Sequence, residues 1–468
     1  MTVLVEKIDV ARPVEEAFAY VSDFTTTLEW DATVTQAVKL TPGSIAIGTE
    51  FEVVCALPVG SVTIVYEVTD LKANKLIELS GSCKFFDILD TIRFSPSDRG
   101  TKIEYRAEFT FPAIAKPFAS LSQSSLDKMG EESLAGLKLA LDDNFPAPTT
   151  STLTRRADQL LLPGISMFSR LGYKLGRKHF NPVSANVRGK HMVVTGATAG
   201  LGFSTAQELA RRGAQLTLVV RDEKKAKSTV AELIRETGNT EIHYELADLS
   251  LMSDVDALVS RMLKRGQAVD VLINNAGALF NPRQETSEGL EKSYALLLLS
   301  PYRLTEGLKP LLLKASAPRV INVVSGGMYS QKLEVDALAN AGSEKYSGSV
   351  AYAKQKRALM VLTQEWAKDW ADEGIVVNAM HPGWADTPGV QDALPVFRKV
   401  TKSVLRSASE GADTIVWLAV ASEAAAVSGE LFLDREVRPA HLLRKTRDSE
   451  GERDKLLKLL SESSSAAA

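Results

Sequence analysis

A glycine turn that joins a buried strand to a helix is the feature that most constrains how this chain folds. Residues 191–202 read as an apolar strand followed by a turn with three glycines, and a helical stretch from 204 to 212 comes next. Gly196 permits the tight turn, Gly200 lets backbone amides approach a pyrophosphate, and Gly202 allows the helix to pack closely on the strand. A glycine pattern alone is a weak signal, but the strand before it and the helix after it predict a dinucleotide site.

The rest of the carboxyl-terminal region repeats this alternation. Further apolar strands are predicted at 215–220 and 269–273, with helical stretches between them. Long apolar strands that alternate with helices predict a doubly wound parallel sheet of the α/β class, covered on both faces. We expect this domain to span 187–445, with a final helix and a disordered tail in 446–468, the Ser/Ala-rich part after Glu462 being the tail.

Composition excludes several classes of protein. At 468 residues and 45% hydrophobic content the chain is long enough for two domains, and a net charge of -3 without a basic cluster argues against nucleic acid as a partner. Two cysteines and five scattered histidines predict neither a disulfide framework nor a metal site. The amino terminus lacks a signal-peptide pattern, and no run of about 18 apolar residues occurs. We therefore expect an intracellular protein in a reducing compartment, most simply the cytoplasm.

The first 145 residues predict a different plan. Helical periodicity follows Pro13 and returns only in a long stretch at 121–142, whereas the residues between read mainly as strands. The strands are predicted at 3–10, 49–55, 61–70, 76–81 and 101–111, and in the last of these apolar residues alternate with charged residues from 102 to 109. An antiparallel sheet with one early helix and one long final helix is an α+β fold in which the helix closes over a concave sheet.

The connecting region, 146–186, begins with prolines and a Thr/Ser run and continues as a basic amphipathic stretch. Its composition at 154–180 suits a helix that lies on a membrane surface. The simpler interpretation, which we favour, is a connector that packs its apolar side on one of the domains.

Residues after successive strands identify the expected nucleotide contacts. Arg221 stands where an enzyme specific for NAD would carry an acidic residue. Its guanidinium can form two hydrogen bonds with a 2'-phosphate, so this position favours NADP(H) over NAD(H). The alternatives are a solvated loop arginine, or Asp222 as the ribose acid. Asp248 and the Asn-Asn-Ala-Gly run at 274–277 follow later strands, on the adenine and nicotinamide-ribose sides.

Tyr352 and Lys356 share one face of a predicted helix. An ammonium near a phenol favours the ionised phenol, so we expect a lowered tyrosine pKa and a usable acid/base near neutral pH. A YxxxK pattern alone is common by chance, and only its place after the nucleotide motifs gives it weight.

These motifs together, TGxxxGxG at 195–202, NNAG at 274–277, Ser325 and YxxxK at 352–356, resemble the short-chain dehydrogenase/reductase superfamily over residues 187–445. The resemblance implies a Rossmann-type fold and an oxidoreductase of the alcohol/carbonyl class. Within the superfamily, the segments at 325–328, 381–389 and 411–414 resemble the group of dehydrogenase/reductase family member 12, whose substrates are poorly defined.

The resemblance also implies roles for individual residues. Tyr352 exchanges a proton with the substrate, Lys356 holds the nicotinamide ribose, and Ser325 orients the substrate oxygen. The expected cofactor-binding residues are Thr195, Gly196, Gly200, Leu201, Gly202, Arg221, Asp248, Leu249, Asn275, Ala276, Gly277, Tyr352, Lys356, Pro382, Gly383 and Thr387. Thr387 would contact the nicotinamide carboxamide.

One position departs from the family's pattern. An alignment without gaps places Leu297 where the family has an asparagine that holds a water of the proton relay, and leucine cannot replace its hydrogen bonds. Leu297 also suits a packed helix interior. Reduced turnover, or a nucleotide sensor and lipid carrier without turnover, therefore remains an alternative.

The first domain resembles the polyketide cyclase and lipid-transport (SRPBCC) superfamily with its START-like helix-grip fold, through the segments at 13–18, 23–31 and 48–49 and the long final helix. That family often encloses apolar ligands, so Phe18 and Trp30 either line a cavity or, as we favour, pack in the core. We expect an oxidoreductase for a small lipophilic substrate that the first domain binds or presents. A cyclase acting in sequence with the reductase is a weaker alternative, and oligomerisation stays open.

Overall fold

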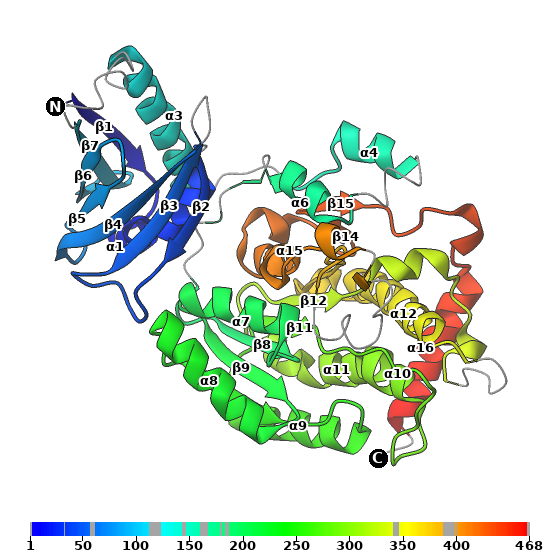
Figure 1. Cartoon of the computed structure of the whole chain (residues 1–468). Coiled ribbons are helices and arrows are strands. Elements are labelled where there is room, and N and C mark those ends of the chain that lie inside the picture. The colour runs from blue at the N-terminus through cyan, green and yellow to red at the C-terminus, as the bar shows by residue number, and fades with distance from the viewer. Residues whose placement is uncertain are drawn as a thin grey trace. The chain divides into compact units, whose positions relative to one another are not determined.

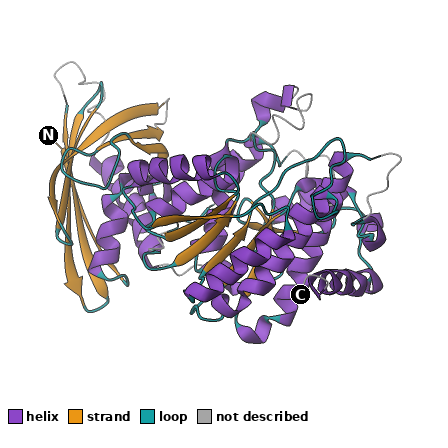
Figure 2. Ribbon diagram, turned by 90° about the horizontal axis from the view of Figure 1, so that it is seen from below, coloured by secondary structure: helices purple, strands orange, loops and turns teal. Residues whose placement is uncertain are grey.

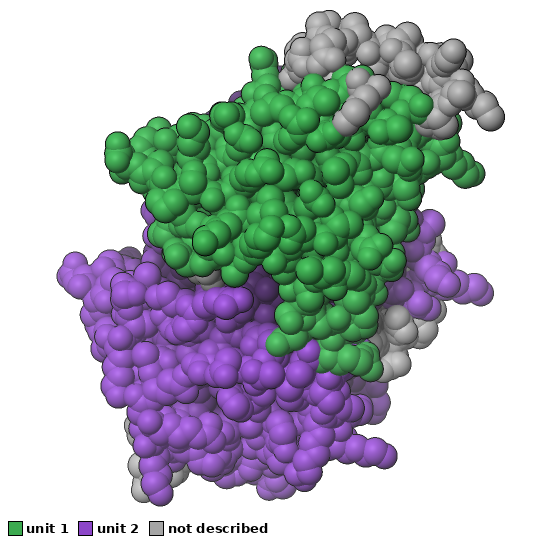
Figure 3. Space-filling model, turned by 90° about the vertical axis from the view of Figure 1, so that its left-hand side faces the viewer, with its two compact units in different colours: residues 1–145, 180–186, 235–238 green, residues 146–179, 187–234, 239–468 purple. Residues whose placement is uncertain are grey.

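The chain forms two compact units. The computed structural model describes residues 2–31, 33–56, 61–111, 123–142, 147–159, 167–177, 180–181, 183, 187–339, 346–386, 398–399 and 401–465. One unit comprises residues 1–145 with 180–186 and 235–238, and the other comprises 146–179, 187–234 and 239–468 (Figure 3). Each unit has a core of its own.

The first unit is a seven-stranded antiparallel sheet with helices against one face (Figure 1). Its strands are β1 (Thr2–Val10), β2 (Val34–Lys39), β3 (Glu50–Ala56), β4 (Ser61–Lys72), β5 (Leu76–Ser82), β6 (Asp87–Ser97) and β7 (Gly100–Thr110). Its helices are α1 (Val14–Ser22), the short η1 (Phe24–Thr26), α2 (Thr27–Trp30) and the long α3 (Gln123–Asp142). The strand order is β1-β7-β6-β5-β4-β3-β2, and α3 packs along β1. This confirms the predicted α+β helix-grip plan.

Two strands of this sheet, β2 and β6, were not predicted from the sequence. Strand β2 contains an irregularity in register between Val34 and Gln36, which breaks the alternation of period two on which such a prediction depends. In β6 the alternation is interrupted by Asp90, a buried carboxyl group in the apolar register of the strand.

Phe18 and Trp30 both serve in packing. Trp30 is buried, and its indole nitrogen donates to Oγ1 of Thr26 at 3.2 Å. Phe18 is half-buried and meets Phe94 edge to face, with ring centroids 5.3 Å apart. The favoured interpretation of these two residues as packing residues agrees with their contacts.

The second unit is an eight-stranded sheet with helices on both faces (Figure 2). Its strands are β8 (His191–Thr195), β9 (Gln215–Val220), β10 (Ile242–Leu246), β11 (Val271–Asn274), β12 (Arg319–Val323), β13 (Val376–Met380), β14 (Leu431–Leu433) and β15 (Glu436–Arg438). Its α-helices are α4 (Thr152–Gln159), α6 (Arg170–Arg177), α7 (Gly200–Arg211), α8 (Glu223–Thr237), α9 (Met252–Arg265), α10 (Lys292–Tyr294), α11 (Ser300–Leu312), α12 (Gly348–Asp369), α15 (Ala408–Val420) and α16 (Glu450–Ser465). Short helical turns include η5 (Gly326–Ser330), and η4 (Ala295–Leu299) is a π-helix.

The order of strands locates the functional edge of this sheet. The order is β10-β9-β8-β11-β12-β13-β14-β15, parallel except for the last pair. The chain starts at β8, proceeds outward through β9 and β10, and then returns to the other side of β8 with β11. The topology therefore reverses between β8 and β11, and in open parallel sheets the crevice at such a reversal is where ligands bind. The predicted doubly wound parallel sheet is confirmed.

Residues 146–179 belong to the second unit rather than forming a free linker. Asp158 forms a buried two-contact ion pair with Arg438, and the Thr150 hydroxyl donates to the Val437 carbonyl at 2.6 Å. Phe168 is buried in the core of this unit. Part of the connector's apolar side, including Phe168, thus packs on the second unit, in agreement with the simpler interpretation of this stretch.

The carboxyl end is more ordered than the sequence suggested. Helix α16 runs to Ser465, beyond the Glu462 boundary expected for a disordered tail, and buries Leu456 and Leu460 in the core. The carbonyl of Ser463 also accepts a hydrogen bond from Arg303 at 2.6 Å. None of the described helices combines the length and apolar composition needed to cross a bilayer.

Candidate active site

The glycine turn lies at the topological reversal and is shaped as the sequence predicts. Gly196 and Gly200 have φ angles of 69° and 57°, in the left-handed region that favours glycine. A Cβ atom at Gly202 would lie 2.3 Å from the Gly196 carbonyl oxygen, so only glycine lets α7 approach the turn. Helix α7 begins after Ala199 without a side-chain cap. Its first backbone amides therefore form a site suited to a phosphate group, and the side chain of Leu201 lies beside them on the first turn.

Thr195 and Asn275 hold the two loops of the crevice together. The Thr195 hydroxyl accepts from the backbone amides of Asn275 and Ala276, each at 2.9 Å, and donates to the Ile273 carbonyl. The Asn275 side-chain amide donates to the Thr195 carbonyl at 2.8 Å. The hydrogen bonds of both side chains thus hold the two loops that form the crevice. Gly277, which follows Ala276, is exposed at the edge of the crevice.

Asp222 and Arg221 occupy different environments at the end of β9. The Asp222 carboxylate accepts from the backbone amide of Lys225 at 3.0 Å and so caps the first turn of α8. Arg221 is exposed. Because the acidic residue is already engaged in the cap, the arginine is the side chain that remains available to a nucleotide at this strand end.

Asp248 follows β10, and its carboxylate is also engaged locally. It accepts from the backbone amide and the hydroxyl of Ser250, at 2.9 and 2.7 Å. Leu249 is buried in the core, so it would contribute only its backbone to a nucleotide site. Asp248 and Leu249 therefore fix the shape of the loop after β10.

The fold assembles the predicted catalytic residues from two elements. Ser325 follows β12, and Tyr352 and Lys356 lie one turn apart on α12. The Ser325 side chain accepts from the Gly327 amide at 3.2 Å and hydrogen bonds with the Tyr352 hydroxyl. The Lys356 ammonium lies 5.8 Å from the centre of the Tyr352 ring and donates to the Val323 carbonyl at 2.7 Å.

The electrostatics differ from the expectation of a lowered tyrosine pKa. Burial raises the pKa of Tyr352 to about 12, and the hydrogen bond with Ser325 opposes this only in part. Burial also lowers the pKa of Lys356 to about 7. The lysine does not depress the tyrosine pKa, because desolvation has the larger effect on the tyrosine and the ammonium points to the Val323 carbonyl. At neutral pH Tyr352 is a phenol, ready to donate a proton.

Leu297 lies in the π-helix η4 and is completely buried. A Cβ atom built on Gly277 would lie 3.1 Å from Cδ2 of Leu297 and 3.8 Å from Nζ of Lys356. The leucine methyl and the catalytic ammonium therefore border the same small space. An apolar side chain fills the position from which a polar one would reach the lysine.

Two residues at this site were not identified from the sequence. A Cβ atom at Gly326 would lie 2.8 Å from Cε2 of Phe168, so the Phe168 ring packs on the backbone next to Ser325. Arg406 fixes that ring in place: its guanidinium donates to the Phe168 carbonyl at 3.0 Å and forms a buried ion pair with Asp434. No sequence motif marks Phe168 as a residue of this site, because only the folded chain brings the connector close to Ser325.

The segment after β13 completes this side of the site. Pro382 and Gly383 are half-buried, and Gly383 has a φ angle of 69°. A Cβ atom there would lie 2.5 Å from the Phe168 carbonyl oxygen, so the glycine is needed for the close approach. Thr387, the predicted carboxamide contact, lies outside the described residues.

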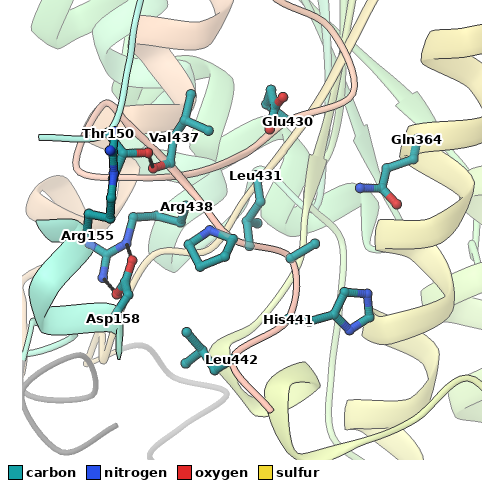
Figure 4. A pocket seen from close by; sticks show the side chains of 12 residues that line it. Thr150, Arg155, Asp158, Gln364, Glu430, Leu431, Val437, Arg438, His441 and Leu442 are labelled. Atoms are coloured by element: carbon teal, nitrogen blue, oxygen red, sulfur yellow. Dashed lines mark hydrogen bonds and ion pairs between the residues drawn. The ribbon is translucent and has the colours of Figure 1, made fainter. Parts of the chain in front are cut away.

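A separate pocket of about 440 Å³ lies beside β15 and α12 (Figure 4). Its walls include the Asp158–Arg438 pair, His441 and Gln364. Gln364 is three turns along α12 from Tyr352, or roughly 18 Å by the helical rise. This pocket is therefore not part of the catalytic site. No group of three or more His, Cys, Asp or Glu side chains suited to a metal ion is found in the described part of the chain.

The parallel sheet, the uncapped glycine turn at its reversal and the Ser325–Tyr352–Lys356 group define an oxidoreductase of the dinucleotide-binding class. Sequence comparisons agree. Residues 190–395 match the family described as short chain dehydrogenase, and residues 1–142 match polyketide cyclase / dehydrase and lipid transport.

Three curated relatives match more than half of the chain. The chain is 43% identical over 305 residues to bovine dehydrogenase/reductase SDR family member 12, covering 64% of this chain and 94% of that protein. It is 34% identical over 264 residues to human retinol dehydrogenase 13, covering 54% and 78%, and 31% identical over 261 residues to human polyprenol dehydrogenase, covering 53% and 78%. The chain belongs to the short-chain dehydrogenase/reductase family.

Proposed function

We propose that this protein is an NADP(H)-dependent oxidoreductase that interconverts a lipophilic carbonyl compound and the corresponding alcohol, with the first unit binding or presenting an apolar ligand. The observation that carries the proposal is the meeting of Ser325, Tyr352 and Lys356 beside the crevice between β8 and β11.

The residues present fit a nicotinamide dinucleotide. The first turn of α7 would hold the pyrophosphate, Arg221 the 2'-phosphate and Lys356 the nicotinamide ribose. The cofactor, when bound, supplies or accepts a hydride at the substrate carbon. The exposed guanidinium of Arg221, beside an Asp222 that is engaged in a cap, supports NADP(H) rather than NAD(H).

Proton transfer follows from the state of Tyr352. In the reducing direction its phenol donates a proton to the substrate oxygen, while Ser325 orients that oxygen through a hydrogen bond. The resulting phenolate must regain a proton from solvent before the next cycle. Lys356, whose pKa lies at about 7, is the neighbouring group best suited to stabilise that phenolate.

The surroundings of Ser325 support a lipophilic substrate. Phe168 stacks against Tyr329 at 6.2 Å between ring centroids and meets Trp384 edge to face at the same distance, so aromatic surface borders the reacting groups. Two of the relatives are named for retinol and polyprenol, which are apolar alcohols.

The experiment is to incubate the full chain with NADPH and a panel of apolar aldehydes and ketones, and with NADP and the matching alcohols, following absorbance of the reduced nicotinamide. Turnover with at least one pair supports the proposal. Tight nucleotide binding without turnover on any of them would favour the alternative of a nucleotide sensor and lipid carrier, which Leu297 motivates.

We also propose that helix α6 contacts a membrane surface. Leu171 and Leu175 are one turn apart and are 66% and 48% exposed, with Lys174 exposed between them. Apolar and basic side chains together suit an interface with anionic lipid. Co-sedimentation with anionic vesicles should be reduced when both leucines are replaced by serine, whereas zwitterionic vesicles should bind weakly in either case. Equal sedimentation of the variant and the wild type would exclude this contact.

A further inference from the structure

One short segment of the connector is held in place by a single buried side chain. The Arg406 guanidinium donates to the carbonyls of three consecutive residues, Met167, Phe168 and Ser169, at 2.7, 3.0 and 3.2 Å. The same guanidinium forms a buried ion pair with Asp434, with contacts of 2.5 and 2.8 Å. A buried ion pair is costly unless its remaining hydrogen bonds are made, and here the three carbonyls accept them. The fold therefore fixes the position of this segment.

The ring of Phe168 packs on two segments that border the reacting groups. Phe168 is 5% exposed, and its ring stacks on Tyr329 of η5 with the centroids 6.2 Å apart. The ring also meets His381 and Trp384, which follow β13, edge to face at 4.6 and 6.2 Å. The backbone amide of Trp384 donates to the Phe168 carbonyl at 2.8 Å. One side chain of the connector thus contacts both η5, which begins directly after Ser325, and the segment after β13.

The backbone that carries Ser325 is fixed on either side of a flexible stretch. Before Ser325, the amide of Val324 donates to a carbonyl of β13 at 2.8 Å, so the chain there still belongs to the sheet. After it, Met328 is completely buried. Between these two residues lie Ser325, Gly326 and Gly327, and glycine has more backbone freedom than any other residue. The position of the Ser325 hydroxyl therefore depends on what packs against the two glycines.

Phe168 is the side chain that packs against the first of them. A Cβ atom built on Gly326 would lie 2.8, 3.3 and 3.5 Å from Cε2, Cδ2 and Cζ of Phe168. Beside Gly327 lies Ala353 of α12, whose Cβ would be 3.7 Å from a Cβ built on that glycine. The ring thus supports the first glycine and helix α12 supports the second.

The supported turn determines the hydrogen bonds of Ser325. Its hydroxyl oxygen accepts from the Gly327 amide at 3.2 Å, and the side chain hydrogen bonds with Tyr352. A shift of the turn would move the hydroxyl relative to Tyr352, because the peptide that follows Ser325 is the one that the Phe168 ring covers. Packing by the connector and the geometry of the reacting groups are therefore linked through a single peptide.

We propose that Phe168 is a positioning residue of the oxidoreductase site, and that by covering Gly326 it holds the Ser325 hydroxyl within hydrogen-bonding reach of Tyr352. Phe168 acts through Ser325 and not by contact with the reacting atoms. The functional unit therefore includes part of the connector, ahead of the boundary at residue 187 that the sequence predicts. The kinetic consequence rests on the proposed function, whereas the placement of Ser325 can be measured without turnover.

The kinetic test is a double-mutant cycle on the full chain, at saturating NADPH and with the best apolar carbonyl substrate of the panel. Phe168→Ala should lower kcat about tenfold to a hundredfold, because a misplacement of about 1 Å can reduce a rate by that much. In Ser325→Ala, which has lost the hydroxyl, the same substitution should lower kcat less than about threefold, since effects of groups that act as a unit do not add. Phe168→Leu keeps an apolar side chain over Gly326 and should retain most of the turnover.

Amide hydrogen exchange measures the placement of Ser325 independently of turnover. The peptide that spans residues 325–330 should exchange faster in Phe168→Ala than in wild type, because the hydrogen bond from the Gly327 amide to Ser325 is loosened. The matched control is Leu258→Ala, which removes a completely buried side chain from the same core but on α9. This control should destabilise the unit and leave both kcat and the exchange of this peptide unchanged.

Unchanged exchange of this peptide in Phe168→Ala would overturn the inference, whether or not the protein turns over a substrate. An equal loss of kcat in the wild-type and Ser325→Ala backgrounds, or an equal loss in Leu258→Ala, would show that Phe168 only stabilises the fold. If wild type or Ser325→Ala has no measurable turnover, the exchange decides. Faster exchange in Phe168→Ala without turnover by wild type would support the placement of Ser325 by Phe168 and reject the proposed activity on these substrates.

Discussion

The raised pKa of Asp90 makes the stability of the first unit depend on pH in an unusual direction. A carboxyl group titrates at about 3.9 in an unfolded chain, whereas Asp90 titrates at about 7 in the folded unit. Between these values the folded state binds more protons than the unfolded state. The free energy of unfolding must therefore fall as pH rises through this window, with the Asp90 contribution fully present below about pH 4 and lost above about pH 7.

The magnitude follows from the two pKa values. Between pH 5 and about pH 7 the folded state binds about one proton more than the unfolded state. This difference extends over roughly two pH units, and each unit corresponds to about 1.36 kcal/mol, so the free energy of unfolding changes by about 2.5 kcal/mol between pH 5 and pH 8. Asp90→Asn has no titrating group and lacks this contribution. On going from pH 5 to pH 8, wild type should thus lose about 2.5 kcal/mol relative to Asp90→Asn. The groups that face Asp90, Tyr66, Tyr105 and Cys55, have raised pKa values and stay neutral over this range, and Asp31 is common to both proteins.

The two cysteines provide an assay specific to this unit, because Cys55 and Cys83 are the only cysteines in the sequence. The full chain is equilibrated in urea at pH 5 or pH 8, transferred to pH 7 and pulsed with a maleimide, and labelling of Cys55 is read by mass spectrometry. The control Asp87→Asn, which removes an exposed carboxylate from the same strand, should behave as wild type. If wild type and Asp90→Asn show the same change in stability between the two pH values, Asp90 does not titrate in the folded unit and the reasoning fails.

Three further predictions concern the second unit. Leu297→Asn should raise turnover, because an amide beside the Lys356 ammonium allows a water relay, at a cost of about 1 to 3 kcal/mol in stability; unchanged turnover in a folded variant would place the relay elsewhere. Arg221→Ala should weaken NADPH binding about tenfold to a hundredfold and leave NADH binding unchanged, and equal wild-type affinities for the two cofactors in titrations would refute the NADP assignment. Arg406→Met should cost about 3 to 5 kcal/mol in urea unfolding because it leaves Asp434 buried and unpaired, whereas adding Asp434→Leu should restore most of the loss; a cost below about 1 kcal/mol would contradict the account of this pair.

The sequence predicted what depends on local pattern. The glycine turn, the strands around it and the positions of Tyr352 and Lys356 on one helix face were all predictable, because turns and helical spacing are short-range properties. The assembly of Ser325 with Tyr352 was implied by the family resemblance and not by spacing. Strand β6 was missed because Asp90 breaks its apolar alternation, and the same residue then proved to be the most informative one in the first unit.

Long-range packing accounts for what the sequence left unpredicted. Phe168 lies far from Ser325 in the chain, and no motif marks it or its partner Arg406. The expected lowering of the Tyr352 pKa was wrong because spacing on a helix says that two groups are neighbours but does not give their degree of burial. Desolvation, which depends on the whole fold, outweighs the charge of Lys356 here.

The most direct test of the central claim is a comparison of wild type with Tyr352→Phe, in which only the hydroxyl that donates the proton is removed. NADPH oxidation is measured with the best apolar carbonyl substrate of the panel, and NADPH affinity is measured by titration on the same preparations. We predict a loss of turnover of about a hundredfold to ten-thousandfold with nearly unchanged nucleotide affinity. Near-normal turnover in Tyr352→Phe would contradict the assignment of Tyr352 as the proton donor of this oxidoreductase.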